Sequence, residues 1–169
     1  MFKRFVILPI GSFERHGVHL PLNTDSIIAE RISIEIAKKK NWIVLPPINY
    51  SPVASKYPNI GVKREVFQKY LGDILKDLEK NNVELALIIL GHGGPEIKHS
   101  VEAAAKNVKL KVYSFHILTE LEKLRLVDQS VDRHAGEWET SLVMCINEEL
   151  VGRFEPSEEV HGDPSKASV

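Results

Sequence analysis

Hydrophobic residues along the chain fall into two kinds of pattern. Short runs of β-branched and aliphatic residues predict strands at 4–10, 42–45, 84–90 and 109–115. Apolar residues that recur every three or four positions predict helices at 24–40, 64–80, 96–107, 118–126 and 135–146. Because strands and helices alternate, we expect βαβ units. The pattern therefore predicts an α/β fold, a three-layer α/β/α sandwich with a mostly parallel sheet.

Two segments refine this picture. The run ELALIIL at 84–90 is the most continuous apolar stretch, which is typical of a central parallel strand covered on both faces. Residues 49–62 form a long connection rich in Pro, Gly, Asn and Ser. Loops of that length in a compact domain are often functional.

Length and charge limit the classes of protein to consider. A chain of 169 residues with 43% hydrophobic content predicts a single domain over residues 1–169. With 22 basic and 23 acidic residues, the sequence has no charge excess that would indicate a nucleic-acid or membrane partner. The charge balance therefore gives no reason to expect either partner.

The single cysteine and the amino terminus bear on redox chemistry and location. Cys145 alone excludes an internal disulfide and a cysteine-based zinc site, and its place on a predicted apolar helix face predicts a buried thiol. Residues 1–11 are basic and then apolar, as in a signal peptide, but no small-residue cleavage site follows. No apolar run is long enough to span a membrane, so we expect a cytoplasmic protein.

Polar residues gather where two predicted strands end. Glu14, His16 and His19 follow the first strand, and Asp25 lies at the opening of the next helix. His92 follows the central strand, between glycines. Ligands bind at the carboxyl ends of strands in such sheets. If the first and third strands are neighbours, the two clusters face each other.

The residue types in these clusters favour a metal site. Glu14 and His16 are two positions apart, so they point the same way in extended backbone. Oxygen and nitrogen ligands without sulfur suit one or two ions of zinc, manganese or ferrous iron. Singly, each residue has a simpler interpretation: Asp25 as a helix cap, His92 as a loop histidine, and Glu14 as a surface partner of Arg15. Together they predict a metal centre.

A third cluster, HAGEWETS at 134–141, has two interpretations. The histidine and the two glutamates, Glu137 and Glu139, could supply a proton donor and an extra metal ligand. Alternatively, the segment is a capped helix with acidic residues in its favoured first turn. The residues alone leave both interpretations open.

Three segments together resemble the creatininase (creatinine amidohydrolase) family. They are LPIGSFERHGVHLPLNTD (8–25), GHGG (91–94) and HAGEWETS (134–141), in that order. The resemblance implies a three-layer sandwich that binds divalent metal, hydrolyses amide bonds outside peptide chains and commonly forms hexamers. It also implies a set of metal ligands: Glu14, His16, Asp25 and His92. Asp25 would bridge two ions.

The same resemblance makes His134 the catalytic histidine, near the leaving nitrogen. Glu139 matches the glutamate before Thr-Ser and is assigned with His134 as catalytic. His19 is expected to orient a ligand carboxylate. When bound, a divalent ion would supply a water of lowered pKa for attack on the substrate carbonyl.

Departures from creatininase proper argue against creatinine as substrate. Gly94 stands where creatininase has a glutamate ligand, and residues 128–132 lack its tryptophan. The HAGExET form is more similar to the archaeal branch that deformylates a formamidopyrimidine ribotide in riboflavin and deazaflavin (F420) biosynthesis; another branch matures the mycofactocin peptide. We favour the deformylase, with a creatininase-like cyclic amidase as the alternative. Residues 162–168 resemble the element that precedes the final helix of the family, so the chain is expected to be a short or truncated member.

Two rival functions stay open at this point. A metal-dependent phosphoesterase would also use two ions, with a basic clamp for which Arg15, Lys56 and Lys63 are candidates. A non-catalytic family member would keep the fold and lose part of the site, as Gly94 suggests. Assays with formamides and phosphate esters, together with metal analysis, separate these functions.

Overall fold

The computed structural model describes residues 4–169 and contains one four-stranded parallel sheet. The strands are β1 (Phe5–Ile10), β2 (Ile43–Val44), β3 (Leu85–Leu90) and β4 (Lys111–His116), in the order β2-β1-β3-β4. The predicted parallel sheet is therefore confirmed, and β1 and β3 are neighbours. Residues 1–3, where the segment considered as a signal peptide begins, lie outside the described residues.

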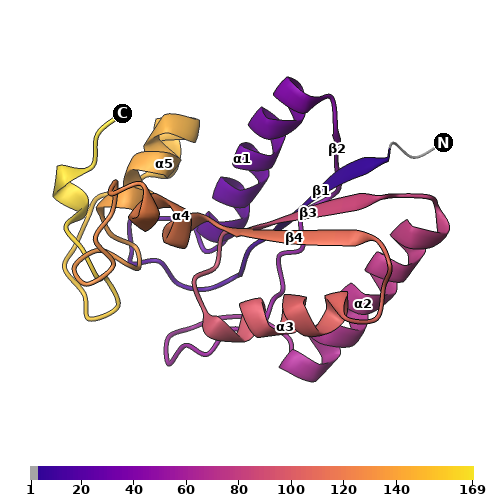
Figure 1. Ribbon diagram of the computed structural model, residues 1–169. Helices are drawn as coiled ribbons and strands as arrows, with labels where there is room; N and C mark the ends of the chain where they lie inside the picture. The colour runs from indigo at the N-terminus through magenta and orange to yellow at the C-terminus, as the bar shows by residue number, and fades with distance from the viewer. Residues whose placement is uncertain (1–3) are drawn as a thin grey trace.

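Helices cover both faces of the sheet and complete the predicted three-layer sandwich (Figure 1). One face carries α1 (Thr24–Lys40), α4 (Ile117–Lys123) and α5 (Glu137–Asn147), and the other carries α2 (Arg64–Lys80) and α3 (Pro95–Ala105). Two short 3₁₀ turns, η1 (Glu148–Leu150) and η2 (Pro164–Lys166), lie near the carboxyl terminus. Within residues 4–169, no helix combines the length and apolar character needed to cross a bilayer.

The central strands contribute side chains to two separate hydrophobic cores, one on each face of the sheet. In β3, Ile88 and Leu90 pack towards α2 and α3, whereas Ile89 packs towards α1 and α4. All three side chains are fully buried. Burial on both faces explains why this strand is continuously apolar rather than alternating.

Two expectations from the sequence are wrong in detail. The helix predicted to reach residue 126 ends earlier, at Lys123, and Arg125 adopts a left-handed conformation with φ of 58°. Cys145 is exposed, not buried. It lies two positions after the buried Val143, and two residues turn a helix by about 200°, which points Cys145 away from the core.

The backbone after β3 and the first turn of α1 approach each other closely at the carboxyl end of the sheet. Gly91 follows β3, and a Cβ atom placed there would lie 2.1 Å from the carbonyl oxygen of Asp25 in α1. Only glycine lets the end of β3 come so near the first turn of α1.

We expect Gly91→Ala to destabilise the protein by at least about 1–3 kcal/mol, because the added methyl group collides with rigid backbone. The matched control is Gly72→Ala in α2, where an added Cβ meets no atom within 4 Å. That change should raise stability by up to about 1 kcal/mol through helix propensity. Urea unfolding measures both free energies. A Gly91→Ala protein as stable as wild type would contradict this packing.

Candidate metal centre

The polar clusters meet where β1 and β3 end, as the adjacency of these strands predicts. Glu14 and His16 come from the loop after β1, and His92 comes from the loop after β3. Asp25 comes from the first turn of α1 and Glu139 from the first turn of α5. All five are buried, with exposed fractions of 0% to 9%. Charged groups at this depth require partners.

The carboxylate of Asp25 occupies the middle of the cluster. Its Oδ1 lies 3.2 Å from His16 Nε2, and its Oδ2 lies 3.2 Å from His92 Nδ1. Ser12 Oγ donates to Asp25 Oδ2 at 2.7 Å and also lies 3.0 Å from Glu14 Oε1. Glu14 Oε1 in turn lies 2.7 Å from His92 Nδ1. Asp25 therefore faces the cluster and does not cap its helix.

Burial and opposite charge shift the pKa values within the cluster. Burial lowers the pKa of His92, but hydrogen bonds to Asp25 and Glu14 outweigh it and raise this pKa to about 10. Burial also lowers the pKa of His16, yet Asp25 and Glu139 bring it well above its ordinary value. Burial raises the pKa of Asp25, and the two histidines hold it well below its usual range. Without metal, protons on the histidines therefore balance the buried carboxylates, and a divalent cation would replace them.

The third cluster reaches the same place through one of its two glutamates. Glu139 Oε1 lies 3.7 Å from His16 Nε2, and Glu139 Oε2 accepts a hydrogen bond from the Ala135 backbone N–H. Glu137 instead lines a neighbouring hollow of about 420 Å³. Glu139 therefore faces the metal site, as one of the two interpretations of this cluster predicts, and Glu137 does not.

His134 stands at the edge of the cluster. Its ring centroid lies 4.5 Å from that of His16, and the ring is half-buried. The Nε2–H of His134 donates to the backbone carbonyl of Arg15 at 3.0 Å. Because a carbonyl only accepts, this bond fixes the proton on Nε2 and leaves Nδ1 as the ring nitrogen for proton transfer.

His19 has a different role from the one expected. Its Nε2 lies 3.2 Å from Thr140 Oγ1, and its ring packs edge-on against Phe154. The backbone N–H of Gly152 donates to the His19 carbonyl at 2.7 Å. His19 therefore ties the loop after β1 to α5 and to the chain that follows α5, and makes no hydrogen bond to a carboxylate of the cluster among the described residues.

The basic residues near the site are arranged differently from the predicted clamp. Arg15 Nε lies 2.9 Å from Glu159 Oε1, a buried carboxylate, so Arg15 does not pair with Glu14. Lys56 lies 3.5 Å from Glu158. Arg133, which sequence reasoning missed, lines the cavity beside His134. The only sign of this role in the sequence was that Arg133 directly precedes the HAGEWETS motif.

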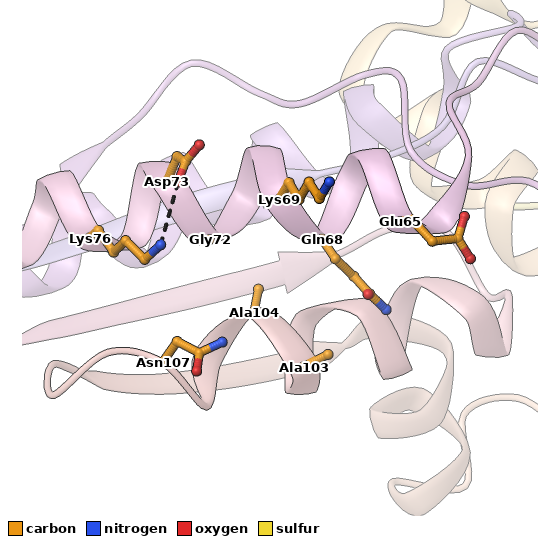
Figure 2. Close-up of a pocket in the computed structure, with 9 residues that line it drawn as sticks. All are labelled: Glu65, Gln68, Lys69, Gly72, Asp73, Lys76, Ala103, Ala104 and Asn107. Carbon is orange, nitrogen blue, oxygen red and sulfur yellow. Dashed lines mark ion pairs between the residues drawn. The ribbon is translucent and has the colours of Figure 1, made fainter.

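A cavity of about 230 Å³ opens onto the cluster. It is lined by Asp25, His92, Gly93, Gly94, Leu118, Gln129, Arg133, His134, Trp138 and Glu139. A larger hollow of about 630 Å³ lies between α2 and α3, on the other face of the sheet (Figure 2). Small and charged side chains line it, including the Lys76–Asp73 pair at 3.6 Å. His92 and His134 line the smaller cavity, which makes it the candidate site for chemistry.

Two groups of side chains are close enough to hold an ion. One group is Glu14, His16 and Asp25, and the other is His16, His134 and Glu139. Within each group, the candidate ligand atoms lie within 4.8 Å of one another. Imidazole nitrogen and carboxylate oxygen fit zinc, manganese or ferrous iron.

Comparison with known families places the chain. The family model for creatininase, described as creatinine amidohydrolase, matches residues 2–168. The chain belongs to the creatininase family. A crystal structure provisionally named creatinine amidohydrolase, from Bacteroides fragilis, superimposes with a TM-score of 0.85 at 24% identity, over 99% of this chain and 82% of that one. Creatininase itself gives a TM-score of 0.75 at 20% identity, over 96% of this chain and 76% of that one. These likenesses establish the fold.

Curated relatives carry different functional names. The mycofactocin precursor peptide peptidase of Mycolicibacterium smegmatis is 29% identical over 154 residues, covering 84% of this chain and 58% of the relative. The 2-amino-5-formylamino-6-ribosylaminopyrimidin-4(3H)-one 5'-monophosphate deformylase of Methanothermobacter marburgensis is 29% identical over 143 residues, covering 82% and 58%. The chain thus spans under two thirds of the length of these relatives. Among solved creatininases, one is a manganese form and one a variant of Zn-Zn type.

The raised pKa of His92 gives the metal-free protein a stability that depends on pH. Against an ordinary value of 6.5, the folded-state pKa is about 10. The protonated ring therefore stabilises the fold below about pH 6.5, and this contribution is lost as pH rises through about 10. We expect chelator-treated protein to lose on the order of a few kcal/mol of unfolding free energy between these limits.

Urea unfolding at several pH values in chelator measures this loss. His92→Gln should make the dependence shallower, because one of the two buried histidines with a raised pKa is gone and only His16 remains. His99→Gln is the control, since His99 is exposed on α3, and it should keep the wild-type slope. Equal slopes in all three proteins would contradict the pairing of His92 with buried carboxylates.

Proposed function

We propose that the protein is a metal-dependent amidohydrolase that cleaves a non-peptide C–N bond, an amide or formamide, in a small molecule. The buried convergence of His16, His92 and Glu14 around Asp25 carries this proposal. The proposed ligands of one or two divalent ions are Glu14, His16, Asp25 and His92. Membership of the creatininase family supports both the metal and the reaction class.

When bound, a divalent ion would supply a water of lowered pKa and polarise the carbonyl of the substrate. The side chains of the protein would orient the ligands and transfer the proton. Ser12 holds the carboxylates of Glu14 and Asp25 through its hydroxyl group, which orients both ligands. The Nε2–H of His134 donates to the Arg15 carbonyl, so Nδ1 would first accept a proton from the attacking water and then pass it to the departing nitrogen.

The favoured substrate is the formamidopyrimidine ribotide. One feature supports a small phosphorylated molecule: Arg133 is an exposed cation that lines the cavity of about 230 Å³. The deformylase relative acts on a substrate of that kind, by its name. A cyclic amide such as creatinine, and a peptide such as that of the mycofactocin relative, are the alternatives.

The remaining expectations stay predictions. A phosphoesterase would need a basic clamp; Arg15 and Lys56 face Glu159 and Glu158, and the third candidate, Lys63, is exposed just before α2. A non-catalytic family member would bind no metal. The cytoplasmic location and the homo-oligomer, a hexamer by family resemblance, also stay predictions.

Replacing the proposed proton donor and a proposed ligand should have separable effects. His134→Ala should lower kcat by about 10²–10⁴, because it removes general acid catalysis, while the metal content survives. His92→Ala should lose metal as well as activity. Elemental analysis and a formamide hydrolysis assay measure the two quantities. Unchanged metal and unchanged turnover in both variants would contradict the assignment.

Arg133 tests the substrate class. Arg133→Ala should raise KM for a phosphorylated formamide by about tenfold or more, since a charge-assisted contact is lost. KM for the unphosphorylated analogue should stay the same. Lys76→Ala is the control, because Lys76 lies by the remote hollow in Figure 2. Equal KM changes for both substrates would argue against a phosphate at this position.

A further inference from the structure

Arg15 lies between two of the proposed metal ligands, Glu14 and His16, and other segments of the chain hold its backbone. The backbone N–H of Arg15 donates to the Pro58 carbonyl at 3.0 Å. The backbone carbonyl of Arg15 accepts from the Nε2–H of His134 at 3.0 Å. The position of this carbonyl therefore decides where the imidazole of His134 stands and which of its ring nitrogens carries the proton.

A buried carboxylate near the end of the chain anchors the side chain of Arg15. The Nε atom of Arg15 lies 2.9 Å from Glu159 Oε1. The side chain of Glu159 is only 2% exposed, and neither of its oxygens makes a hydrogen bond within residues 4–169, so the pair rests on charge. A carboxylate at this depth is unfavourable unless a cation faces it. Glu159 therefore holds in place the Arg15 side chain, which is itself 39% exposed.

The segment that carries Glu159 also holds the backbone of His134. His161 follows Glu159 by two residues and forms an antiparallel bridge with His134. In this bridge the His161 N–H donates to the His134 carbonyl at 2.8 Å, and the Arg133 N–H donates to the His161 carbonyl at 2.9 Å. Residues 159–161, in the part of the chain that follows α5 (Figure 1), thus contact both partners of the hydrogen bond between Arg15 and His134.

The neighbouring residue, Glu158, is a built-in comparison. It carries the same side chain, but that side chain is 87% exposed and lies 3.5 Å from Lys56 at the surface. Exposed pairs of this kind contribute little to stability or geometry. The two adjacent glutamates therefore differ in burial and in partner, and only Glu159 is connected to the site.

We propose that Glu159 is a positioning residue for the proton-transfer histidine: its buried carboxylate fixes Arg15, and the Arg15 carbonyl fixes the ring of His134. This inference rests on the proposed function, in which His134 passes a proton to the departing nitrogen. Without the charge of Glu159, the Arg15 side chain is free to turn towards water. The Arg15 carbonyl then loses its fixed direction, and the His134 ring is no longer held in one orientation.

A double-mutant cycle separates this role from general support of the fold. Glu159→Gln keeps the size of the side chain and removes its charge. We expect kcat for formamide hydrolysis to fall by about tenfold or more, with KM and metal content unchanged. In the His134→Ala protein the same change should lower kcat by less than about twofold, because the residue that it positions is absent. Glu158→Gln is the matched control and should leave kcat unchanged.

A second variant guards against a folding defect in the single one. Arg15→Gln combined with Glu159→Gln removes both charges and leaves no buried charge unpaired, so the fold should survive, as circular dichroism would verify. We expect this double variant to show the same fall in kcat as Glu159→Gln. Wild-type kcat in the folded double variant would contradict the positioning role.

Nitrogen NMR of labelled histidine gives a readout that does not depend on activity. In protein prepared with zinc, the His134 signals are identified by their loss in His134→Ala. Wild type and Glu158→Gln should show a proton on Nε2 of His134 and none on Nδ1. In Glu159→Gln, the Nε2 proton should exchange faster with water, and the signals of the two tautomers should mix.

Three results would overturn this inference and leave the proposed function standing. They are loss of metal in Glu159→Gln, an equal fall in kcat with and without His134, and an unchanged His134 spectrum in Glu159→Gln. A wild-type protein that hydrolyses no formamide would instead overturn the proposed function. In that case the NMR comparison alone would support or overturn the link from Glu159 to His134.

Discussion

The carboxylate of Asp25 is the constraint on which the site depends. It is buried, and its two oxygens face different histidines, His16 and His92, both at 3.2 Å. A buried charge in this position costs several kcal/mol unless cations face it. Without metal, protons on the histidines compensate the negative charge of Asp25. Divalent ions, with two positive charges each, would compensate it more strongly. The same balance that shifts the pKa values therefore makes a strong cation site.

The topology of the sheet brings the residues of the site together. Parallel pairing of β1 with β3 brings the ends of both strands to one edge, and Gly91 lets β3 end against the backbone of Asp25. α5 then adds Glu139, and the segment before α5 adds His134, from further along the chain. Three segments distant along the chain thus meet at one point, as the topology of parallel α/β sheets favours.

The sequence was informative where a pattern had one physical solution. Alternating strands and helices predicted the layers, and the doubly buried β3 identified the centre of the sheet. The strand-end clusters predicted which polar residues would meet, and Glu14, His16, Asp25 and His92 do meet. Prediction failed where orientation around a helix or partner choice decides. Cys145 points outward, His19 contacts Thr140, and the choice between Glu137 and Glu139 required coordinates. Arg133 was missed because a lone cation carries no spacing signal.

The most direct test is anomalous scattering at the absorption edges of manganese, iron and zinc, from a crystal grown with the metal. The account predicts a peak about 2.0–2.3 Å from an oxygen of Asp25, with Glu14 and His92 completing its coordination. A map with no peak near Asp25, in a crystal whose metal lies only on exposed carboxylates, would contradict it.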